Sequence, residues 1–139
     1  MKQFIKKLLP NREEHFKVPS KPLIIAVDFD GTCVRDAYPK VGEAMPGSVQ
    51  TLHSLLLREH RLILWTCREG EQLRDAIDWF KEKDLTLFGV NETPIEGDFR
   101  KGGGRKVFAD LYIDDRNFGG FPGWPKVHQE LLGMPLIGY

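Results

Sequence analysis

Residues 23–32 join an apolar run to a pair of acids and read Leu23-Ile24-Ile25-Ala26-Val27-Asp28-Phe29-Asp30-Gly31-Thr32. The apolar part is continuous, partly β-branched and short, which predicts a strand buried on both faces of a parallel sheet. Gly31 supplies backbone freedom where the chain must bend after the strand, and Thr32 can hydrogen-bond that turn. The turn can therefore aim Asp28 and Asp30 at one point.

Strand and helix patterns alternate along the rest of the chain. Apolar runs predict further strands, and periodic apolar residues predict helices; the strands are at 62–65, 85–90 and 111–113, and the helices at 46–59, 71–83 and 126–132. This alternation indicates an α/β fold with a parallel sheet and right-handed crossovers. We therefore expect one three-layer, Rossmann-like domain over residues 23–139, preceded by a leader segment at residues 1–22.

Length and composition limit the class of protein. The chain has 139 residues, which suits one domain, and its 20 basic and 20 acidic side chains give no net charge. That balance argues against binding a nucleic-acid polymer or a membrane through bulk charge, although the basic loop at 101–106 leaves polynucleotide ends open as substrates. No apolar run approaches the roughly 20 residues of a membrane helix, and the sequence has no disulfide framework. We expect a cytoplasmic protein.

Three of the predicted strands end at polar side chains. Asp28 follows the first strand, Thr66 follows the second, and Asp114-Asp115 follow the strand at 111–113. In open parallel sheets, ligands bind beyond the carboxyl ends of the strands, near a topological switch point. Carboxylates and a hydroxyl should therefore meet at one edge of the sheet, and burial of a core does not require that arrangement.

These residues resemble the four motifs of the haloacid dehalogenase (HAD) superfamily, in the family's order. The matching pieces are DFDGT at 28–32, Thr66 in ILWTCR, Lys106 in KVFADLYIDDR, and Asp114-Asp115. The resemblance covers about residues 23–116 and is closest to small, capless HAD-type phosphatases and hydrolases. Neither interval between the first three motifs has room for a cap domain, so the resemblance implies an open site with a flap at about residues 33–45.

The resemblance implies a Mg²⁺-dependent phosphatase that hydrolyses a phosphomonoester through an aspartyl-phosphate on Asp28. Asp30 would be the general acid for the leaving group and then the general base for water. The carboxylates of Asp28 and Asp114 and the backbone carbonyl of Asp30 would hold the Mg²⁺ ion. Asp115 would orient metal-bound water.

Thr66 and Lys106 are the phosphate-binding residues that the resemblance implies. Thr66 would donate a hydrogen bond to a phosphoryl oxygen, and Lys106 would pair with Asp28 and the transferring group. Lys101 and Arg105 lie in the same glycine-rich loop and are alternatives to Lys106. The substrate is expected to be a phosphorylated molecule, and the sequence does not specify which one or the oligomeric state.

Two other functions use the same motifs. One is a phosphotransferase that forms the same aspartyl-phosphate, and the other is a catalytically silent phosphate-binding module. The presence of both Asp28 and Asp30 argues against a silent module, and Thr32 after the aspartates favours hydrolysis over transfer. Both functions remain alternatives that activity measurements can distinguish.

Three further residues lie close to the motifs. Arg68 could contact the substrate or form a surface salt bridge with Glu69 or Glu71. Cys33 and Cys67 each follow a motif threonine, and we expect small buried thiols at both positions. A redox switch between them is the alternative.

Overall fold

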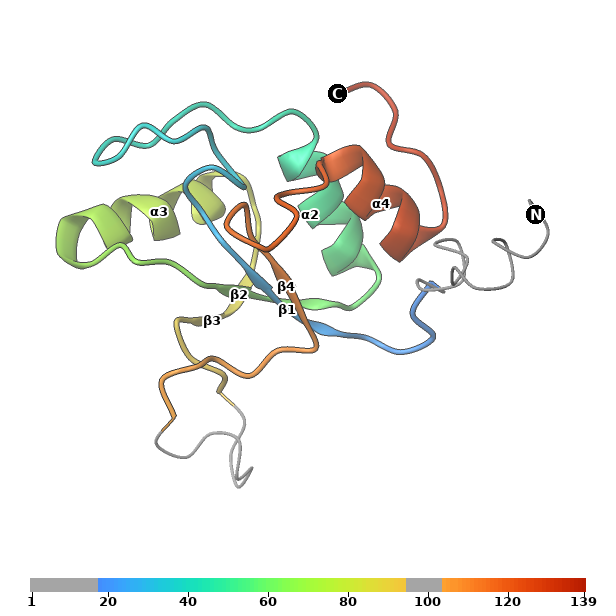
Figure 1. Cartoon of the computed structure of the whole chain (residues 1–139), viewed down its shortest axis with the longest axis horizontal. Coiled ribbons are helices and arrows are strands. Elements are labelled where there is room, and N and C mark those ends of the chain that lie inside the picture. The colour runs from blue at the N-terminus through green and yellow to red at the C-terminus, as the bar shows by residue number, and fades with distance from the viewer. Residues whose placement is uncertain (1–17, 95–103) are drawn as a thin grey trace, which may run out of the picture.

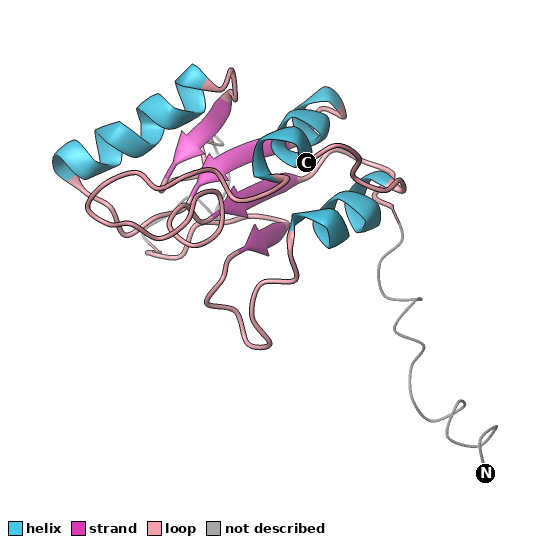
Figure 2. Cartoon of the chain, turned by 90° about the horizontal axis from the view of Figure 1, so that it is seen from above, coloured by secondary structure: helices cyan, strands magenta, loops and turns pink. Residues whose placement is uncertain are grey.

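The computed structural model describes residues 18–94 and 104–139, which contain one sheet of four strands. The strands are β1 (Ile24–Val27), β2 (Arg61–Leu64), β3 (Leu87–Val90) and β4 (Leu111–Ile113). Their order in the sheet is β3-β2-β1-β4, all pairings are parallel, and the strand arrows in Figure 2 point the same way. The chain moves from β1 through β2 to β3 and then returns to the far side of β1. The boundary between β1 and β4 is therefore the switch point.

Helices cover one face of this sheet, as Figure 1 shows. In the described residues they are α2 (Ser48–Leu57), α3 (Gly70–Glu82) and α4 (Trp124–Leu132). They enclose the main core, which includes Ile25, Val27, Leu62, Leu64, Leu52, Leu55, Phe80 and Leu131. The ends of α4 follow from its sequence, because Pro125 suits the first turn and Gly133 adopts the left-handed φ of 73° that ends the helix.

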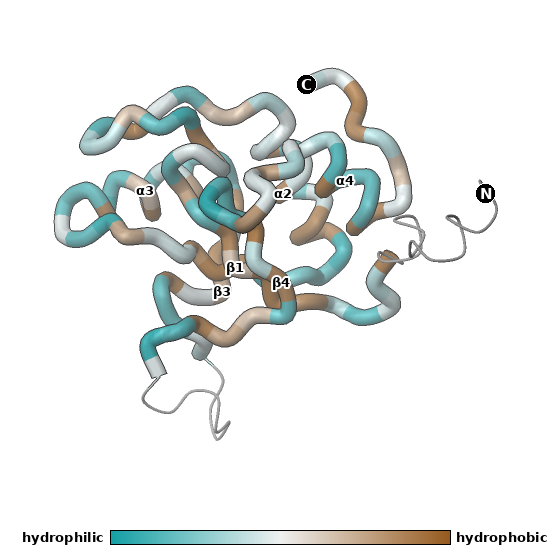
Figure 3. The backbone as a smooth tube through the Cα atoms, in the orientation of Figure 1, coloured by the Kyte–Doolittle hydropathy of each residue, from teal (hydrophilic) through white to brown (hydrophobic). Residues whose placement is uncertain are grey.

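Residues 104–110 form the layer on the opposite face. A second, smaller core lies there and consists of Ile24, Ala26, Ile63, Val107 and Ala109. Because side chains alternate along a strand, β1 directs Ile25 and Val27 toward the helices and its other two side chains toward this segment. Figure 3 shows the resulting concentration of hydrophobic residues along β1 and β4. The expected three-layer α/β architecture is confirmed, and the described part of the third layer contains no helix.

The predicted elements all occur, with bounds that differ from the prediction by at most two residues. Residues 1–17 of the predicted leader lie outside the described residues, and so do residues 95–103 with Lys101. In the described chain, the intervals between the first three motifs hold the flap, two helices and two strands, and no cap domain. None of the helices in residues 18–94 and 104–139 has the length and apolar character needed to span a bilayer.

Candidate active site

The carboxyl ends of β1 and β4 bring the predicted acids together. Asp28 follows β1 directly, Asp114 and Asp115 follow β4, and the two strands pair up to Val27 and Ile113. The amide of Asp28 still donates to the carbonyl oxygen of Ile113 over 2.9 Å, so the pairing extends to the first acid. The acids therefore lie at the switch point, where the strand pattern predicted a ligand site.

Phe29 sets the direction of the two aspartates beside it. Its side chain is fully buried and packs edge-to-face on Trp79 of α3, with ring centroids 5.6 Å apart. Because consecutive side chains of an extended chain point to opposite sides, this burial turns Asp28 and Asp30 away from the core. Gly31 then bends the chain at a φ of 83°, and an added Cβ would collide with the carboxylate of Asp115. Both the backbone angle and the space at this position require glycine.

Asp28, Asp114 and Asp115 form an acidic cluster, in which one carboxylate oxygen from each lies within 4.8 Å of the other two. Thr32 connects two of them, because its Oγ1 donates to Oδ2 of Asp28 over 3.0 Å and accepts from the amide of Asp115 over 3.1 Å. Within the described residues, no basic side chain forms an ion pair with the cluster. The resemblance implied a supporting role for Asp115 behind the other two, whereas the structure places its carboxylate beside theirs.

The surroundings of the acidic cluster raise the pKa of Asp28 to about 7. Burial is the largest cause, followed by repulsion from Asp114; Asp115 raises the pKa further, and the hydrogen bond from Thr32 opposes the rise. Hard divalent cations bind carboxylate oxygens, and a bound cation would offset the repulsion among these carboxylates. In the adjoining turn, backbone hydrogen bonds use the carbonyls of Phe29 and Val34 and leave that of Asp30 available to a cation. The residues present therefore fit the Mg²⁺ ion that the resemblance implies.

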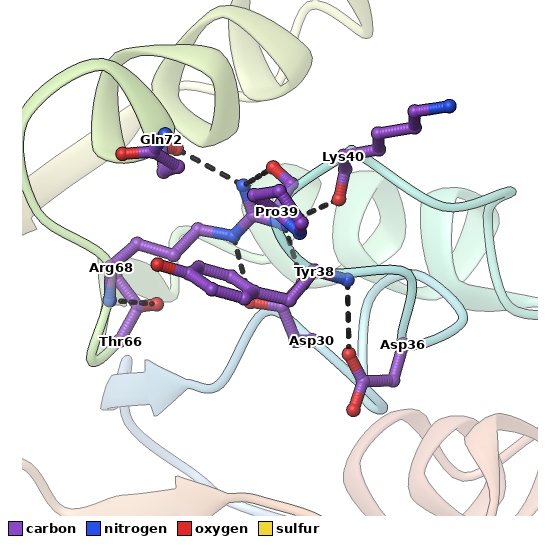
Figure 4. A network of polar contacts seen from close by, with 8 residues as sticks. All are labelled: Asp30, Asp36, Tyr38, Pro39, Lys40, Thr66, Arg68 and Gln72. Atoms are coloured by element: carbon purple, nitrogen blue, oxygen red, sulfur yellow. Dashed lines mark hydrogen bonds and ion pairs between the residues drawn. The ribbon is translucent and has the colours of Figure 1, made fainter.

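Asp30 has a different partner, the guanidinium of Arg68. Nε of Arg68 donates to Oδ2 of Asp30 and Nη2 donates to Oδ1, both over 2.7 Å (Figure 4). The remaining N–H groups donate to backbone carbonyls: Nη1 to Pro39 and Gln72 over 3.1 and 3.2 Å, and Nη2 to Lys40 over 2.7 Å. Hydrogen bonding to Asp30 and the charge of that carboxylate raise the pKa of Arg68 against the opposing effect of burial, and the side chain is 1% exposed. A bidentate pair of this kind fixes the plane of the carboxylate.

Arg68 departs from its predicted environment. We expected substrate contact or a surface salt bridge with Glu69 or Glu71, but the residue is buried and its ion pair is with Asp30. Prediction from neighbours in sequence was wrong because the partner lies 38 positions earlier, in the turn after β1. β1 and β2 are neighbours in the sheet, so the two residues that follow them meet only once the sheet has formed.

The predicted flap at residues 33–45 contains a short antiparallel pairing. Val34 and Ala44 form a β-bridge, and the amide of Arg35 donates to the carbonyl of Glu43 over 2.8 Å. Tyr38 lies on the flap with 61% of its surface exposed, and its ring centroid is 5.3 Å from Cζ of Arg68. The flap is thus connected to the aspartate turn through Arg68.

Thr66 is held at the end of β2 by Asn91, a residue that the sequence reasoning missed. The amide of Thr66 donates to Oδ1 of Asn91 over 2.8 Å, and Nδ2 of Asn91 donates to the Thr66 carbonyl over 3.0 Å. Asn91 has a φ of 53°, a left-handed conformation that asparagine tolerates well. Its position directly after an apolar strand, like those of Asp28 and Asp114, was the signal that could have identified it. Oγ1 of Thr66 accepts from the amide of Arg68 over 3.1 Å and keeps its own hydrogen to donate.

Lys106 lies on the face of the sheet opposite the helices. Its Nζ is 5.1 Å from the ring centroid of Tyr112 in β4, and no ion pair or hydrogen bond between described residues joins it to the acidic cluster. Arg105 and Lys106 line a small polar pocket of about 150 Å³ together with Asn91, the residue that holds Thr66. The structure therefore places Lys106 near the carboxyl edge of β3 but not in contact with Asp28. Lys101 is outside the described residues.

The two cysteines have different environments. Cys33 is fully buried, and burial raises the pKa of its thiol well above the usual value, which makes it a poor nucleophile. Cys67 is exposed, so the expectation of a buried thiol is wrong at this position. Cys67 is in the turn between β2 and α3, where the buried side chain is that of Arg68.

The fold and the site together define a parallel α/β protein with an acidic centre at its switch point. A solved structure from Bacteroides thetaiotaomicron, described as a conserved protein, is 46% identical to this chain and superposes with a TM-score of 0.71. The match covers 78% of this chain and 88% of the Bacteroides protein. The chain belongs to the same family as that conserved protein. No protein-family model matches the chain, and no curated protein does.

Proposed function

We propose that this protein is a Mg²⁺-dependent phosphatase that acts on phosphomonoesters through an aspartyl-phosphate on Asp28. The observation that carries the proposal is the acidic cluster of Asp28, Asp114 and Asp115 beside the hydroxyl of Thr32. These carboxylates and the backbone carbonyl of Asp30 would hold the cation. When bound, the cation would neutralise charge on the carboxylates and the phosphoryl oxygens.

The reaction has two displacements at phosphorus. In the first, a carboxylate oxygen of Asp28 attacks phosphorus, the bond to the ester oxygen breaks, and that oxygen takes a proton from Asp30. In the second, water attacks the aspartyl-phosphate and gives a proton to Asp30. Inorganic phosphate leaves and the carboxylate of Asp28 is restored. The proton that Asp30 gives up in the first displacement is replaced by the one it takes in the second, so each cycle starts with Asp30 protonated. Each oxygen of Asp30 accepts one N–H from Arg68, and its second lone pair carries the proton that is transferred.

Two residues supply further contacts to the phosphoryl group. Thr66, held by its two hydrogen bonds to Asn91, donates its hydroxyl to a phosphoryl oxygen. Lys106 is our first candidate for the positive charge, which requires its side chain to leave the ring of Tyr112. Substitution of Lys101, Arg105 and Lys106 by methionine, one at a time, assigns that charge to the residue whose loss raises KM most.

The test is hydrolysis of an aryl phosphate by the wild type and by Asp28→Asn, with Mg²⁺ and with a chelator. The exposed Asp78 of α3 provides the matched control, Asp78→Asn. The proposal expects turnover that needs both Mg²⁺ and Asp28 and is unchanged in the control. Borohydride reduction of the intermediate, followed by mass spectrometry, should find homoserine at position 28. Equal turnover in Asp28→Asn would overturn the mechanism, and phosphate binding without turnover would support the silent binding module.

A further inference from the structure

The hydrogen bonds of Arg68 leave it no donor for a substrate. An arginine side chain has five N–H groups, and all five donate to Asp30 or to the carbonyls of Pro39, Lys40 and Gln72. A phosphate or a leaving group could bind Arg68 only by displacing one of these acceptors. Arg68 is therefore a built-in partner of Asp30 rather than a substrate ligand.

The acceptors of Arg68 belong to three separate segments. Asp30 is in the turn after β1, Pro39 and Lys40 are in the flap, and Gln72 is in the first turns of α3. Figure 4 shows the guanidinium between these groups, with the ring of Tyr38 beside it. A second aromatic contact is with Phe29, whose ring centroid is 5.1 Å from Cζ of Arg68. One planar cation thus joins the flap to the turn that carries both aspartates.

The pair is buried on one side and open on the other. The side chain of Arg68 is 1% exposed, whereas that of Asp30 is 21% exposed. The carboxylate of Asp30 is therefore accessible while its plane is fixed by two short hydrogen bonds. A group that must exchange a proton with a substrate needs this combination of access and fixed orientation.

We propose that Arg68 is a positioning residue that holds the carboxylate of Asp30 and the flap as one unit at the rim of the site. This inference rests on the proposed function for its catalytic part, because Asp30 is the proton-transfer group there. Its structural part, the coupling between Arg68 and the flap, is independent of any activity. Displacement of the flap would release the acceptors at Pro39 and Lys40 and loosen the orientation of Asp30.

The main test is Arg68→Lys, which keeps the positive charge but cannot make the planar, five-donor contact. We expect kcat for an aryl phosphate to fall by about 10- to 100-fold with little change in KM, because a misplaced proton-transfer group slows the chemical step. Hydrogen exchange measures the flap directly, at the amides of Arg35 and Met45, which bond to Glu43 and Cys33. We expect their exchange to be about 10-fold faster in the variant.

Arg74→Lys is the matched control, since Arg74 is exposed on α3. Its kcat and flap exchange should equal those of the wild type.

Arg68→Ala adds a test of shape, because it leaves a space lined by acceptors for a planar cation. Guanidinium at millimolar concentration should restore kcat and slow flap exchange, while methylammonium should restore neither. A purely structural loss of folded protein would not respond to the shape of the added cation.

The readouts separate failure of this inference from failure of the proposed function. If the flap amides of Arg68→Lys exchange at the wild-type rate, the inference is overturned, whatever the activity. If they exchange faster but kcat equals that of the wild type, the positioning role is overturned and the proposed phosphatase function is unaffected. If the wild type hydrolyses no phosphomonoester and the flap still loosens in Arg68→Lys, the coupling is supported and the proposed function is contradicted.

Discussion

Asp28 and Asp30 share one turn but have opposite surroundings. Asp28 lies beside two other carboxylates and has no basic partner in the described residues, whereas Asp30 is held by a guanidinium over two bonds of 2.7 Å. The buried ring of Phe29 lies between them in sequence and fixes the turn. Two carboxylates in different environments can take different roles, one as nucleophile and cation ligand and the other in proton transfer.

The two aspartates also differ in the balance of charge around them. The acidic cluster has excess negative charge, which a divalent cation would balance, and its geometry depends on Thr32 and Gly31. The pair of Asp30 and Arg68 is balanced in charge, and all five N–H donors of Arg68 are used without any ligand. We therefore expect the acidic cluster to respond to metal and pH. The pair of Asp30 and Arg68 should respond to substitutions that alter the flap.

The largest expected effect is that of Asp28→Asn on turnover. Loss of the proposed covalent nucleophile should lower kcat by roughly 10³-fold or more. The same substitution should make the chelated protein more stable at pH 8, because it removes one of three mutually repelling carboxylates. Thermal unfolding in a chelator measures that change, and a lower melting temperature than wild type would contradict the charge excess that we assign to the cluster.

Asp30→Asn should also impair turnover, but its effect on stability has the opposite sign. Loss of a proton-transfer group costs about 10²- to 10⁴-fold in rate. The buried guanidinium of Arg68 would lose its counter-charge, and breaking a buried pair from one side typically costs about 3 kcal/mol. Urea unfolding compares the two variants directly. If Asp30→Asn is as stable as the wild type, the ion pair does not support the fold and the contrast between the aspartates is weaker.

The sequence was sufficient for the sheet and the acidic cluster for a physical reason. Strand and helix periodicities are local signals, and in a parallel sheet the carboxyl ends of neighbouring strands share one edge. Asp28 and Asp114 could therefore be placed together without knowledge of any side-chain contact. To predict the acids of the cluster, only the strand ends and the switch point had to be known.

The contacts of Arg68 and Asn91 could not be predicted in the same way. Arg68 pairs with a residue 38 positions earlier, and Asn91 bonds to one 25 positions earlier, so no local pattern specifies either contact. The layer at residues 104–110 was also missed, because an extended segment without periodicity gives no signal that it covers a sheet. These parts depend on where connections between elements lie in the folded chain.

Thr32→Val tests how the acidic cluster is held together. Thr32 is fully buried, and valine keeps its shape while removing the donor to Asp28 and the acceptor for the amide of Asp115. The loss should cost about 1–3 kcal/mol, the range for leaving a buried polar group unsatisfied. It should also weaken Mg²⁺ binding, which calorimetry measures. Unchanged affinity would mean that the carboxylates are positioned without the hydroxyl.

The pH dependence of stability tests the charge excess of the cluster more finely. Because the pKa of Asp28 is about 7 in the folded protein and lower in the unfolded chain, the folded state binds more protons between about pH 4 and 7. Stability in a chelator should therefore fall as pH rises through this window. Saturating Mg²⁺ should reduce the slope, since cation binding favours the ionised carboxylate. A slope that is the same with Mg²⁺ and with chelator would argue against a cation at Asp28.

His60 gives the smallest expected effect and an internal reference for that experiment. It is buried directly before β2, at the other end of that strand from Thr66, and its Nδ1 accepts from the amide of Leu23 over 2.9 Å. Burial lowers its pKa, with a smaller contribution from Arg58, so the unfolded chain binds the extra proton as pH falls below about 6.5. Stability should fall with decreasing pH there, opposite in sign to the contribution of Asp28. His60→Asn supplies an uncharged acceptor and should remove this acid loss while leaving the slope from Asp28 unchanged. If it removes both, the two groups are coupled through β1, and the pH slope cannot be assigned to the acidic cluster alone.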